Sequence, residues 1–417
     1  MKVLHIATTD YGGAGIGMIN LHKSLLSKGI DSKILLAKKT TSLDTIFQME
    51  PNFHLYKWSG NRIVRKIQSF ARNRGFLKTE VELWNSRIET ASKGCDVPIC
   101  FTSPCTTYDI TNHPLVQDAD IIHLHWVGDF LDYKSFFAKT NKPIVWTLRD
   151  ENPGLGGFHY RTDKNIYEKQ YGIIEDTFLK IKEKALTDAG NLTLVALSDA
   201  MVDFCKKNSY LSQKRLYKIY NSIDDKDFSP TNMEVARRVL GIDDDVFTIS
   251  FVSVVLNDHR KGLQNLMDAL KLIDYRVRVL CVGKNNFFRS VPENVFCYGN
   301  VENSRLLSLI YSASDIFVNP TLKESFGKTI VEALMCGVPV ATTAEGVAPE
   351  IINEECGCLL DNASPQSIAS ALEYVRNKQY NRKNIREMIR PIFLPEKIVN
   401  QHIGMYNDIL STNNYFE

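Results

Sequence analysis

The sequence of 417 residues contains no run of about 18 apolar residues, the length that a helix needs to cross a bilayer. Its first residues, MKVLHIATTD, lack the basic and then apolar regions of a signal peptide and are typical of a short buried strand. The formal net charge is only +2, so no overall excess of basic residues points to nucleic acid as a partner. We therefore expect a cytoplasmic globular protein in which any anion site arises from local charge.

Cysteines are few for this length and follow no metal-binding pattern. Cys95, Cys100 and Cys105 recur every five residues, and Cys356 and Cys358 form a close pair, but neither spacing is a usual zinc motif. A chain this long can bury enough apolar surface without disulfides. The nine cysteines thus predict reduced thiols in a cytosolic compartment, and no metal site is expected.

Hydrophobic patterning predicts two α/β domains, because single cores rarely grow beyond about 250 to 300 residues. Short apolar runs alternate with helical patterns, which is typical of parallel sheets with crossover helices. The expected strands are residues 3–7, 32–36, 121–125, 144–148, 192–197 and 216–221, and then 247–254, 277–282, 295–298, 316–319 and 338–342.

A polar segment at residues 221–230, which ends in proline, separates the two series of strands. We expect domains at 1–220 and 221–395, with an inserted or variable basic region at about 57–112, and a terminal helical segment at 396–417 that docks back on the first domain. The predicted fold class is α/β, with two doubly wound Rossmann-like domains facing across a cleft. Ligands of such sheets bind at the carboxyl ends of the strands.

The most informative segment is residues 319–340, which predicts a strand end, a loop, a helix and a return to a strand. It holds Glu324 and Glu332 eight residues apart, which is about 12 Å at ~1.5 Å per residue. Between them, free backbone N–H groups of residues 325–328 can bind a phosphate, and Gly327 permits close approach. This layout suits a nucleotide sugar, with hydroxyls on both sides of a diphosphate. A capping glutamate beside a solvated one would give the same spacing.

The segment resembles the donor-site signature of the family 4 glycosyltransferases of the GT-B fold. Further motifs resemble that family in the same order: YGGAGIG at 11–17, DIIHLHW at 120–126, KPIVWTL at 142–148, NSID at 221–224, RKG at 260–262 and YGNV at 298–301. The sequence looks most like bacterial enzymes that build capsule, exopolysaccharide or O-antigen units. The resemblance implies an acceptor-side N-terminal domain and a C-terminal domain that binds the nucleotide sugar.

The resemblance also implies roles for individual residues. Glu324 is expected to bind hydroxyls of the donor sugar, Glu332 to hold the ribose, and Lys261 to bind the diphosphate and stabilise the leaving group. Arg260 either shares the role of Lys261 or is a solvated charge. The donor-binding candidates are Gly12, Gly13, Arg260, Lys261, Glu324, Ser325, Phe326, Gly327, Lys328 and Glu332.

One departure from the family concerns the opposite wall of the site. Many relatives carry a histidine and then an aspartate after the strand at 144–148, whereas this chain has Arg149 and Asp150. Arginine cannot act as a general base at neutral pH, but it can bind the donor or an anionic acceptor. His125 could enter the cleft, and a histidine satisfied by hydrogen bonds is the alternative. The candidate catalytic residues are Lys261, Glu324, Arg149 and His125.

Residues 57–78 carry seven basic side chains and no acidic one: Lys57, Arg62, Arg65, Lys66, Arg72, Arg74 and Lys78. Apolar residues recur among them at helical spacing, which predicts a basic amphipathic helix. Such a helix either rests on anionic lipid at the inner face of the cell membrane or presents a solvated basic face.

The predicted function is retaining transfer of a sugar from a nucleotide diphosphate sugar to a glycan or lipid-linked glycan acceptor, in bacterial surface polysaccharide synthesis. No cofactor is expected beyond the donor substrate. The alternatives are a non-catalytic partner protein of the GT-B fold, or a GT-B phosphorylase or epimerase.

Overall fold

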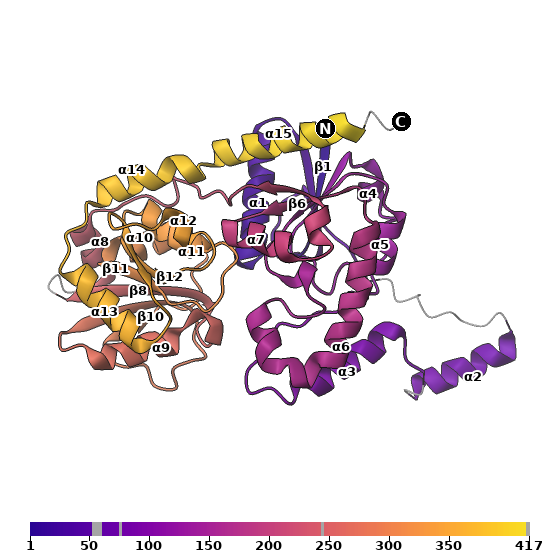
Figure 1. Cartoon of the computed structure of the whole chain (residues 1–417), viewed down its shortest axis with the longest axis horizontal. Coiled ribbons are helices and arrows are strands. Elements are labelled where there is room, and N and C mark those ends of the chain that lie inside the picture. The colour runs from indigo at the N-terminus through magenta and orange to yellow at the C-terminus, as the bar shows by residue number, and fades with distance from the viewer. Residues whose placement is uncertain (52–60, 75–76, 243–245, 414–417) are drawn as a thin grey trace. The chain divides into compact units, whose positions relative to one another are not determined.

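The computed structural model describes residues 1–51, 61–74, 77–242 and 246–413 of the chain (Figure 1). It divides into two compact units. Unit 1 consists of Met1–Ala196, Val202–Tyr217 and Met405–Glu417, and unit 2 consists of Leu197–Met201 and Lys218–Gly404. Each unit is built around its own parallel sheet.

The sheet of unit 1 has seven strands in the order β3-β2-β1-β4-β5-β6-β7. Its strands are β1 (Lys2–Thr9), β2 (Asp31–Lys38), β3 (Ile46–Gln48), β4 (Ile121–Leu124), β5 (Ile144–Thr147), β6 (Leu192–Ala196) and β7 (Arg215–Lys218). The strand order reverses between β1 and β4, which pair in parallel. This is a topological switch point, at which open α/β sheets place their ligands.

Helices join these strands as crossover connections. They are α1 (Gly12–Ser27), α2 (Arg62–Asn73), α3 (Glu80–Ser92), α4 (Pro114–Asp118), α5 (Tyr133–Lys139), α6 (Arg161–Asp188) and α7 (Asp199–Lys207). The start of α3 is fixed by a capping box, in which Thr79 and Glu82 satisfy each other's backbone amides. The α2 helix confirms the helical spacing of the basic segment.

Unit 2 has a six-stranded sheet in the order β10-β9-β8-β11-β12-β13. Its strands are β8 (Phe247–Val255), β9 (Val277–Lys284), β10 (Val295–Cys297), β11 (Ile316–Asn319), β12 (Val340–Thr343) and β13 (Gly357–Leu360). Its helices are α8 (Met233–Leu240), α9 (Leu263–Ala269), α10 (Ser304–Ala313), α11 (Lys328–Met335), α12 (Ala348–Ile351), α13 (Pro365–Arg376) and α14 (Arg382–Phe393); α15 (Pro395–Asn413) ends the described chain.

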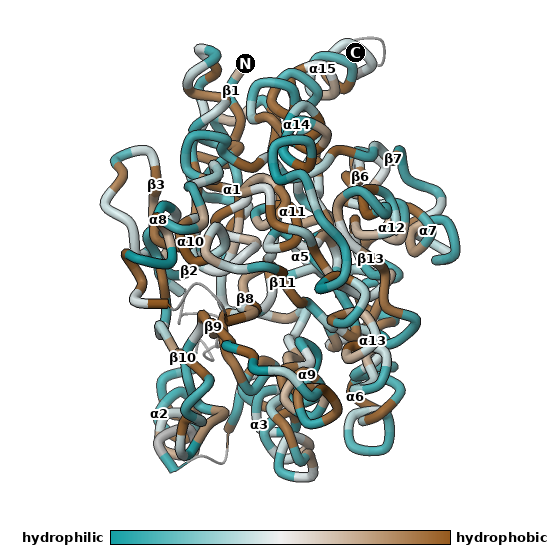
Figure 2. Tube along the Cα trace, turned by 90° about the vertical axis from the view of Figure 1, so that its left-hand side faces the viewer, coloured by the Kyte–Doolittle hydropathy of each residue, from teal (hydrophilic) through white to brown (hydrophobic). Residues whose placement is uncertain are grey.

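The sheet of unit 2 is buried on both faces, and most residues of its strands are apolar (Figure 2). Side chains alternate between the two faces of a strand. Phe317 of β11 therefore lies in the core with Val331 of α11, whereas its neighbours Ile316 and Val318 lie in the core on the other face. This packing fixes the position of the end of β11 relative to the start of α11.

Two doubly wound α/β units confirm the predicted fold class, and each predicted strand overlaps an observed one. The short strands β3 and β13 were not predicted. The predicted terminal helix is α15, although residues 414–417 lie outside the described residues, and the chain from Met405 onwards belongs to unit 1. All nine cysteines are described and none forms a disulfide. In the described part of the chain, no helix has both the length and the apolarity to cross a bilayer.

Candidate active site

The loop between β11 and α11 carries most of the predicted donor-binding residues. The chain turns into α11 at Gly327, whose φ of +89° lies in the left-handed region. Phe326 is buried in the core, and its carbonyl accepts a hydrogen bond of 2.8 Å from the amide of Val347. The buried ring and the hydrogen bond of Phe326 therefore hold the loop in place just before α11 begins.

A second loop, after β8, packs directly against this one. The carbonyl of Arg260 accepts hydrogen bonds from Leu322 N at 2.7 Å and from Thr321 Oγ1 at 3.0 Å. Gly262 has a φ of +75°, and a Cβ there would lie 2.3 Å from the carbonyl oxygen of Pro320. Only glycine fits this close approach, which brings Lys261 to the loop of Glu324.

Charged side chains form one ion pair across these loops and another within the loop after β8. Lys261 donates to the carboxylate of Glu324. Arg260 forms an ion pair of 2.8 Å with Asp258 of its own loop. The structure thus brings Arg260 and Lys261 to the loop of Glu324, although Lys261 and Glu324 are 63 residues apart in the sequence.

Glu332 is buried on α11 and has two partners. Its carboxylate pairs with Lys328 one turn earlier and accepts a hydrogen bond of 3.4 Å from the hydroxyl of Tyr311. Burial and the nearby charge of Glu332 hold the pKa of Tyr311 well above its usual value, so the phenol stays a donor. Sequence reasoning missed Tyr311, because α10 lies outside the motif.

Ser325 stands out because its hydroxyl has no hydrogen-bond partner among the described residues, although only 5% of the residue is exposed. Its carbonyl accepts a hydrogen bond of 2.9 Å from Ser198 Oγ, which fixes the backbone. The side-chain amide nitrogen of Asn319, at the end of β11, is also buried without a partner there. Buried polar groups are rarely left unpaired, so both are candidates for contact with a ligand.

The remaining candidates lie in unit 1. Gly12 and Gly13 form the first turn of α1, directly after Tyr11, and a Cβ on either would meet nothing within 4 Å. Asp10, at the end of β1, accepts hydrogen bonds of 2.8 Å from the amides of Thr40 and Thr41. This carboxylate ties the loop after β2 to the end of β1.

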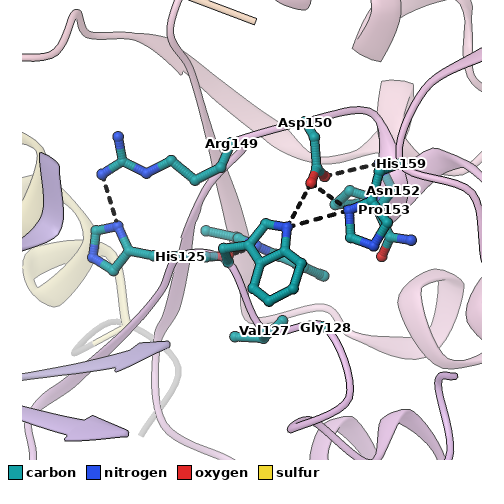
Figure 3. A pocket seen from close by; sticks show the side chains of 10 residues that line it. His125, Val127, Gly128, Arg149, Asp150, Asn152, Pro153 and His159 are labelled. Atoms are coloured by element: carbon teal, nitrogen blue, oxygen red, sulfur yellow. Dashed lines mark hydrogen bonds and ion pairs between the residues drawn. The ribbon is translucent and has the colours of Figure 1, made fainter. Parts of the chain in front are cut away.

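A small pocket of about 10 Å³ lies where β4 and β5 end, and His125 and Arg149 line it (Figure 3). Arg149 Nη2 donates to His125 Nδ1 at 3.0 Å. Burial lowers the pKa of Arg149 to about 9, because the charged form loses hydration. The structure therefore places these two predicted catalytic residues in contact.

The other side of the pocket is an ion pair that the sequence did not reveal. Asp150 Oδ2 lies 2.5 Å from His159 Nδ1 and accepts a hydrogen bond of 2.8 Å from Trp126 Nε1 (Figure 3). Burial acts to lower the pKa of His159, but the charge and hydrogen bond of Asp150 raise it to about 10. His159 is thus a buried cation at neutral pH.

Residues of α6 hold the loop that carries these groups. The carboxylate of Glu175 accepts hydrogen bonds from the backbone amides of Gly156 and Gly157 at 2.8 and 2.6 Å. Lys182 donates to the carbonyl and side-chain oxygens of Asn152 at 2.9 and 2.7 Å. Both side chains are buried on a helix whose sequence reads as charged and solvated, so no local signal could have found them.

The described residues include one group of three histidines, His5, His123 and His125, whose ring nitrogens lie within 4.8 Å of one another. All three are buried. No metal was expected from the sequence, and the rings of this group form hydrogen bonds with Arg149, Thr147 and Tyr406.

Known proteins share this architecture. The chain superposes on sucrose-phosphate synthase of Thermosynechococcus elongatus with a TM-score of 0.69 and 16% identity, covering 99% of this chain and 100% of that one. HepE of Anabaena, solved in complex with UDP and glucose, gives a TM-score of 0.66 and 17% identity, over 98% and 100% of the chains. Two α/β units, each with a parallel sheet, and these structural neighbours define a protein of the GT-B fold.

The sequence comparisons find similarity to glycosyltransferases. Residues 246–377 match the family described as "Glycosyl transferases group 1". CapM of Staphylococcus aureus, a capsular polysaccharide biosynthesis glycosyltransferase, is 26% identical over 206 residues, which are 46% of this chain and 53% of CapM. The chain thus spans about half the length of the first curated relatives it matches.

Proposed function

We propose that the protein transfers a sugar from a nucleotide diphosphate sugar to a glycan or lipid-linked glycan acceptor, as in bacterial surface polysaccharide synthesis. The observation that carries this proposal is the loop before α11. There the buried Ser325 hydroxyl, which has no hydrogen-bond partner among the described residues, lies between two lysine-paired carboxylates, Glu324 and Glu332. Such a loop offers acceptors for sugar and ribose hydroxyls and donors for a diphosphate.

In this proposal, each part of the nucleotide sugar has a residue that binds it. Glu324 accepts hydrogen bonds from hydroxyls of the transferred sugar, and Glu332 accepts them from the ribose. Lys261 moves its charge from Glu324 to the diphosphate, where it stabilises the negative charge of the leaving group. Crystals of HepE with UDP-glucose support a donor of this type for a protein of this fold.

Transfer would retain the configuration at the anomeric carbon. The bond from this carbon to the phosphate oxygen breaks while the acceptor hydroxyl forms a new bond on the same face. The hydroxyl proton passes to an oxygen of the departing diphosphate. Arg149, oriented by His125, binds an anionic group and does not act as a base, since a guanidinium has no lone pair to accept a proton.

A thermal-shift screen against nucleotide diphosphate sugars would identify the donor. Calorimetry would then compare Glu332→Ala and Lys261→Ala with the wild type. We expect each to weaken donor binding by at least about tenfold, because charge-assisted hydrogen bonds contribute about 1.5 to 3 kcal/mol. Glu387→Ala is a matched control, since Glu387 forms an i,i+4 pair with Lys383 on α14. Unchanged affinity in both site variants would refute the donor site.

The alternatives predict different reactions. A non-catalytic GT-B partner would bind the donor without hydrolysing it, whereas a transferase hydrolyses its donor slowly when no acceptor is present. An epimerase would change the sugar without transferring it, and a phosphorylase would require phosphate. Product analysis of the donor from the screen separates these cases.

We also propose that α2 rests on an anionic membrane at the cytoplasmic face, close to a lipid-linked acceptor. Its apolar residues Ile63, Ile67 and Phe70 are 71%, 62% and 59% exposed and recur on one face of the helix. Arg62, Arg65 and Lys66 are exposed beside them, and teal and brown alternate along α2 in Figure 2. Of the other predicted basic residues, Lys57 and the side chain of Arg72 lie outside the described residues.

Cosedimentation with vesicles tests this contact. Replacing Arg62, Arg65 and Lys66 with glutamine should reduce binding to vesicles with anionic lipid by about a hundredfold, at ~1 kcal/mol per basic residue near the surface. Lys206→Gln with Lys207→Gln, at the exposed end of α7, is the control. Equal binding by the wild type and the α2 variant would exclude the membrane contact.

A further inference from the structure

Three histidine rings pack against one another in the sheet of unit 1. His5 lies on β1, directly beside His123 of β4, and His125 follows two residues later on the same face. The ring centroids of His123 and His125 are 4.3 Å apart in a stacked arrangement, and His5 is 5.2 Å from each. We call His5, His123 and His125 the histidine cluster. Its members are buried, so their hydrogen bonds decide their protonation.

Each end of the histidine cluster is bound to a different part of unit 1. His123 Nδ1 lies 2.6 Å from the hydroxyl of Tyr406 on α15, and its Nε2 lies 2.7 Å from Thr147 Oγ1 on β5. His125 Nδ1 lies 3.0 Å from Arg149 Nη2, and its Nε2 lies 2.9 Å from His5 Nδ1. Arg149 is therefore connected to the interior of the sheet through two histidines.

The chemistry of the groups sets the direction of this connection. A guanidinium only donates hydrogen bonds, so His125 Nδ1 must accept and must carry no proton. A neutral imidazole then holds its proton on Nε2 and donates it to His5 Nδ1. His5 Nδ1 is in turn an acceptor, which leaves the proton of His5 on Nε2. The three side chains form a hydrogen-bond chain that runs one way, from Arg149 through His125 to His5.

We propose that His125 and His5 are positioning residues that fix the guanidinium of Arg149 for an anionic ligand. His123, held by Tyr406 and Thr147, packs on the ring of His125 and keeps it in line. This role deepens the proposed function, on which it rests for the identity of the ligand. The histidines act on the ligand only through Arg149.

The same geometry argues against a metal in the histidine cluster. A neutral imidazole offers a single lone pair, and that of His125 is already directed at Arg149. Both nitrogens of His123 are bonded to hydroxyl groups. A metal ion would have to break the hydrogen bond between His125 and His5, so the hydrogen-bond chain and a metal site exclude each other.

Nuclear magnetic resonance of the full chain, labelled with ¹⁵N in histidine, tests the direction of the chain. We expect His125 and His5 both to be neutral at pH 7.5 with the proton on Nε2, and we assign them by the signals lost in His125→Asn and His5→Asn. A proton on Nδ1 of either residue, or an imidazolium, would overturn the proposal. Stoichiometric binding of added zinc that shifts all three histidines would overturn it too.

The effect on Arg149 is measured by its modification with phenylglyoxal, followed by peptide mass spectrometry with Arg260 as the internal reference. His5→Leu removes the acceptor and should raise the rate at Arg149 about threefold to tenfold, as expected for one lost hydrogen bond. His5→Asn can keep an acceptor near the Nδ1 position and should restore the wild-type rate.

His22→Leu is the matched control. His22 is a buried neighbour, 6.1 Å from His5 between ring centroids, but it bonds to Ser32 and Thr45 instead. An equal increase in His22→Leu, or none in His5→Leu, would contradict the positioning role. Neither measurement needs a sugar donor or a glycan acceptor as substrate. A failure of the proposed transferase activity would therefore be distinct from a failure of this inference.

Discussion

At the scale of residues, two ion pairs occupy the places where the donor is proposed to bind. Lys261 pairs with Glu324, and Lys328 pairs with Glu332 one helical turn away. The paired lysines hold both carboxylates in position without a ligand. The sequence predicted these residues because most of them lie in one continuous segment. Tyr311 could not be predicted, since it comes from another helix and meets Glu332 only in the folded chain.

The hydroxyl of Ser325 has no hydrogen-bond partner in the described part of the chain, so its removal should affect donor binding and protein stability differently. Ser325→Ala should weaken binding of the donor by about threefold to tenfold, as one hydrogen bond is lost. It should leave the free energy of unfolding of the ligand-free protein unchanged or higher, because the hydroxyl forms no hydrogen bond with the residues that the structure describes. Calorimetry and urea unfolding would measure the two quantities.

Ser198→Ala provides the contrast for this prediction. Its hydroxyl donates to the carbonyl of Ser325, so we expect a loss of about 1 kcal/mol in unfolding free energy. If Ser325→Ala destabilised the ligand-free protein as much as Ser198→Ala, the hydroxyl of Ser325 would have a structural partner after all.

At the scale of elements, the loop from Asp150 to His159 depends on α6. Lys182 holds Asn152, and Glu175 holds the glycine amides, while Asp150 pairs with His159. A buried lysine and a buried imidazolium respond to pH in opposite directions. Burial lowers the pKa of Lys182 to about 7, whereas the pKa of His159 is raised to about 10.

The signs follow from the folded and unfolded pKa values. His159 contributes stability that is complete below its usual pKa of 6.5 and is lost as pH rises towards about 10. The depressed pKa of Lys182 makes stability rise with pH between about 7 and its usual 10.5. The two contributions oppose each other over the same range in the wild type.

Single substitutions should separate these contributions. In Lys182→Met, the unfolding free energy should fall between pH 7 and pH 9, because His159 alone remains in this pair of opposing groups. In His159→Gln it should rise over the same interval. Urea unfolding at the two pH values measures the difference between the variants, which cancels groups common to both. Identical pH slopes would show that the two side chains do not have these protonation states.

At the scale of the whole molecule, the chain returns to unit 1 at its end. Tyr406 of α15 is buried and bonds to His123, 283 positions earlier in the sequence. The helix itself could be predicted from its local pattern. Its partner could not, because a buried tyrosine gives no local sign of the histidine that it contacts.

Tyr406→Phe tests how much the hydrogen bond between Tyr406 and His123 contributes to stability. It keeps the ring but removes the hydroxyl, so a buried nitrogen of His123 loses its partner. We expect the unfolding free energy to fall by about 1 to 3 kcal/mol. Tyr217→Phe is the control, because its hydroxyl bonds to exposed Asp408 at 3.3 Å and its loss should cost little. Equal stability of wild type and Tyr406→Phe in urea would mean that His123 is satisfied without α15.

The sequence by itself determined the two α/β series, nearly all of the strands and the donor-binding candidates. These features are local, since strand and helix periodicity and the Glu324 motif each lie within a short stretch of chain. It did not reveal β3 and β13, which are short strands at sheet edges.

Only the tertiary structure decided the partners of the candidate residues. It joined the loop of Lys261 to that of Glu324, paired Asp150 with His159, and connected Arg149 to His5 through His125. Such pairs bring together side chains from separate elements, and hydrogen-bond geometry and burial exist only once those elements pack. The direction of the hydrogen-bond chain behind Arg149 is therefore a property of the folded unit and not of any one segment.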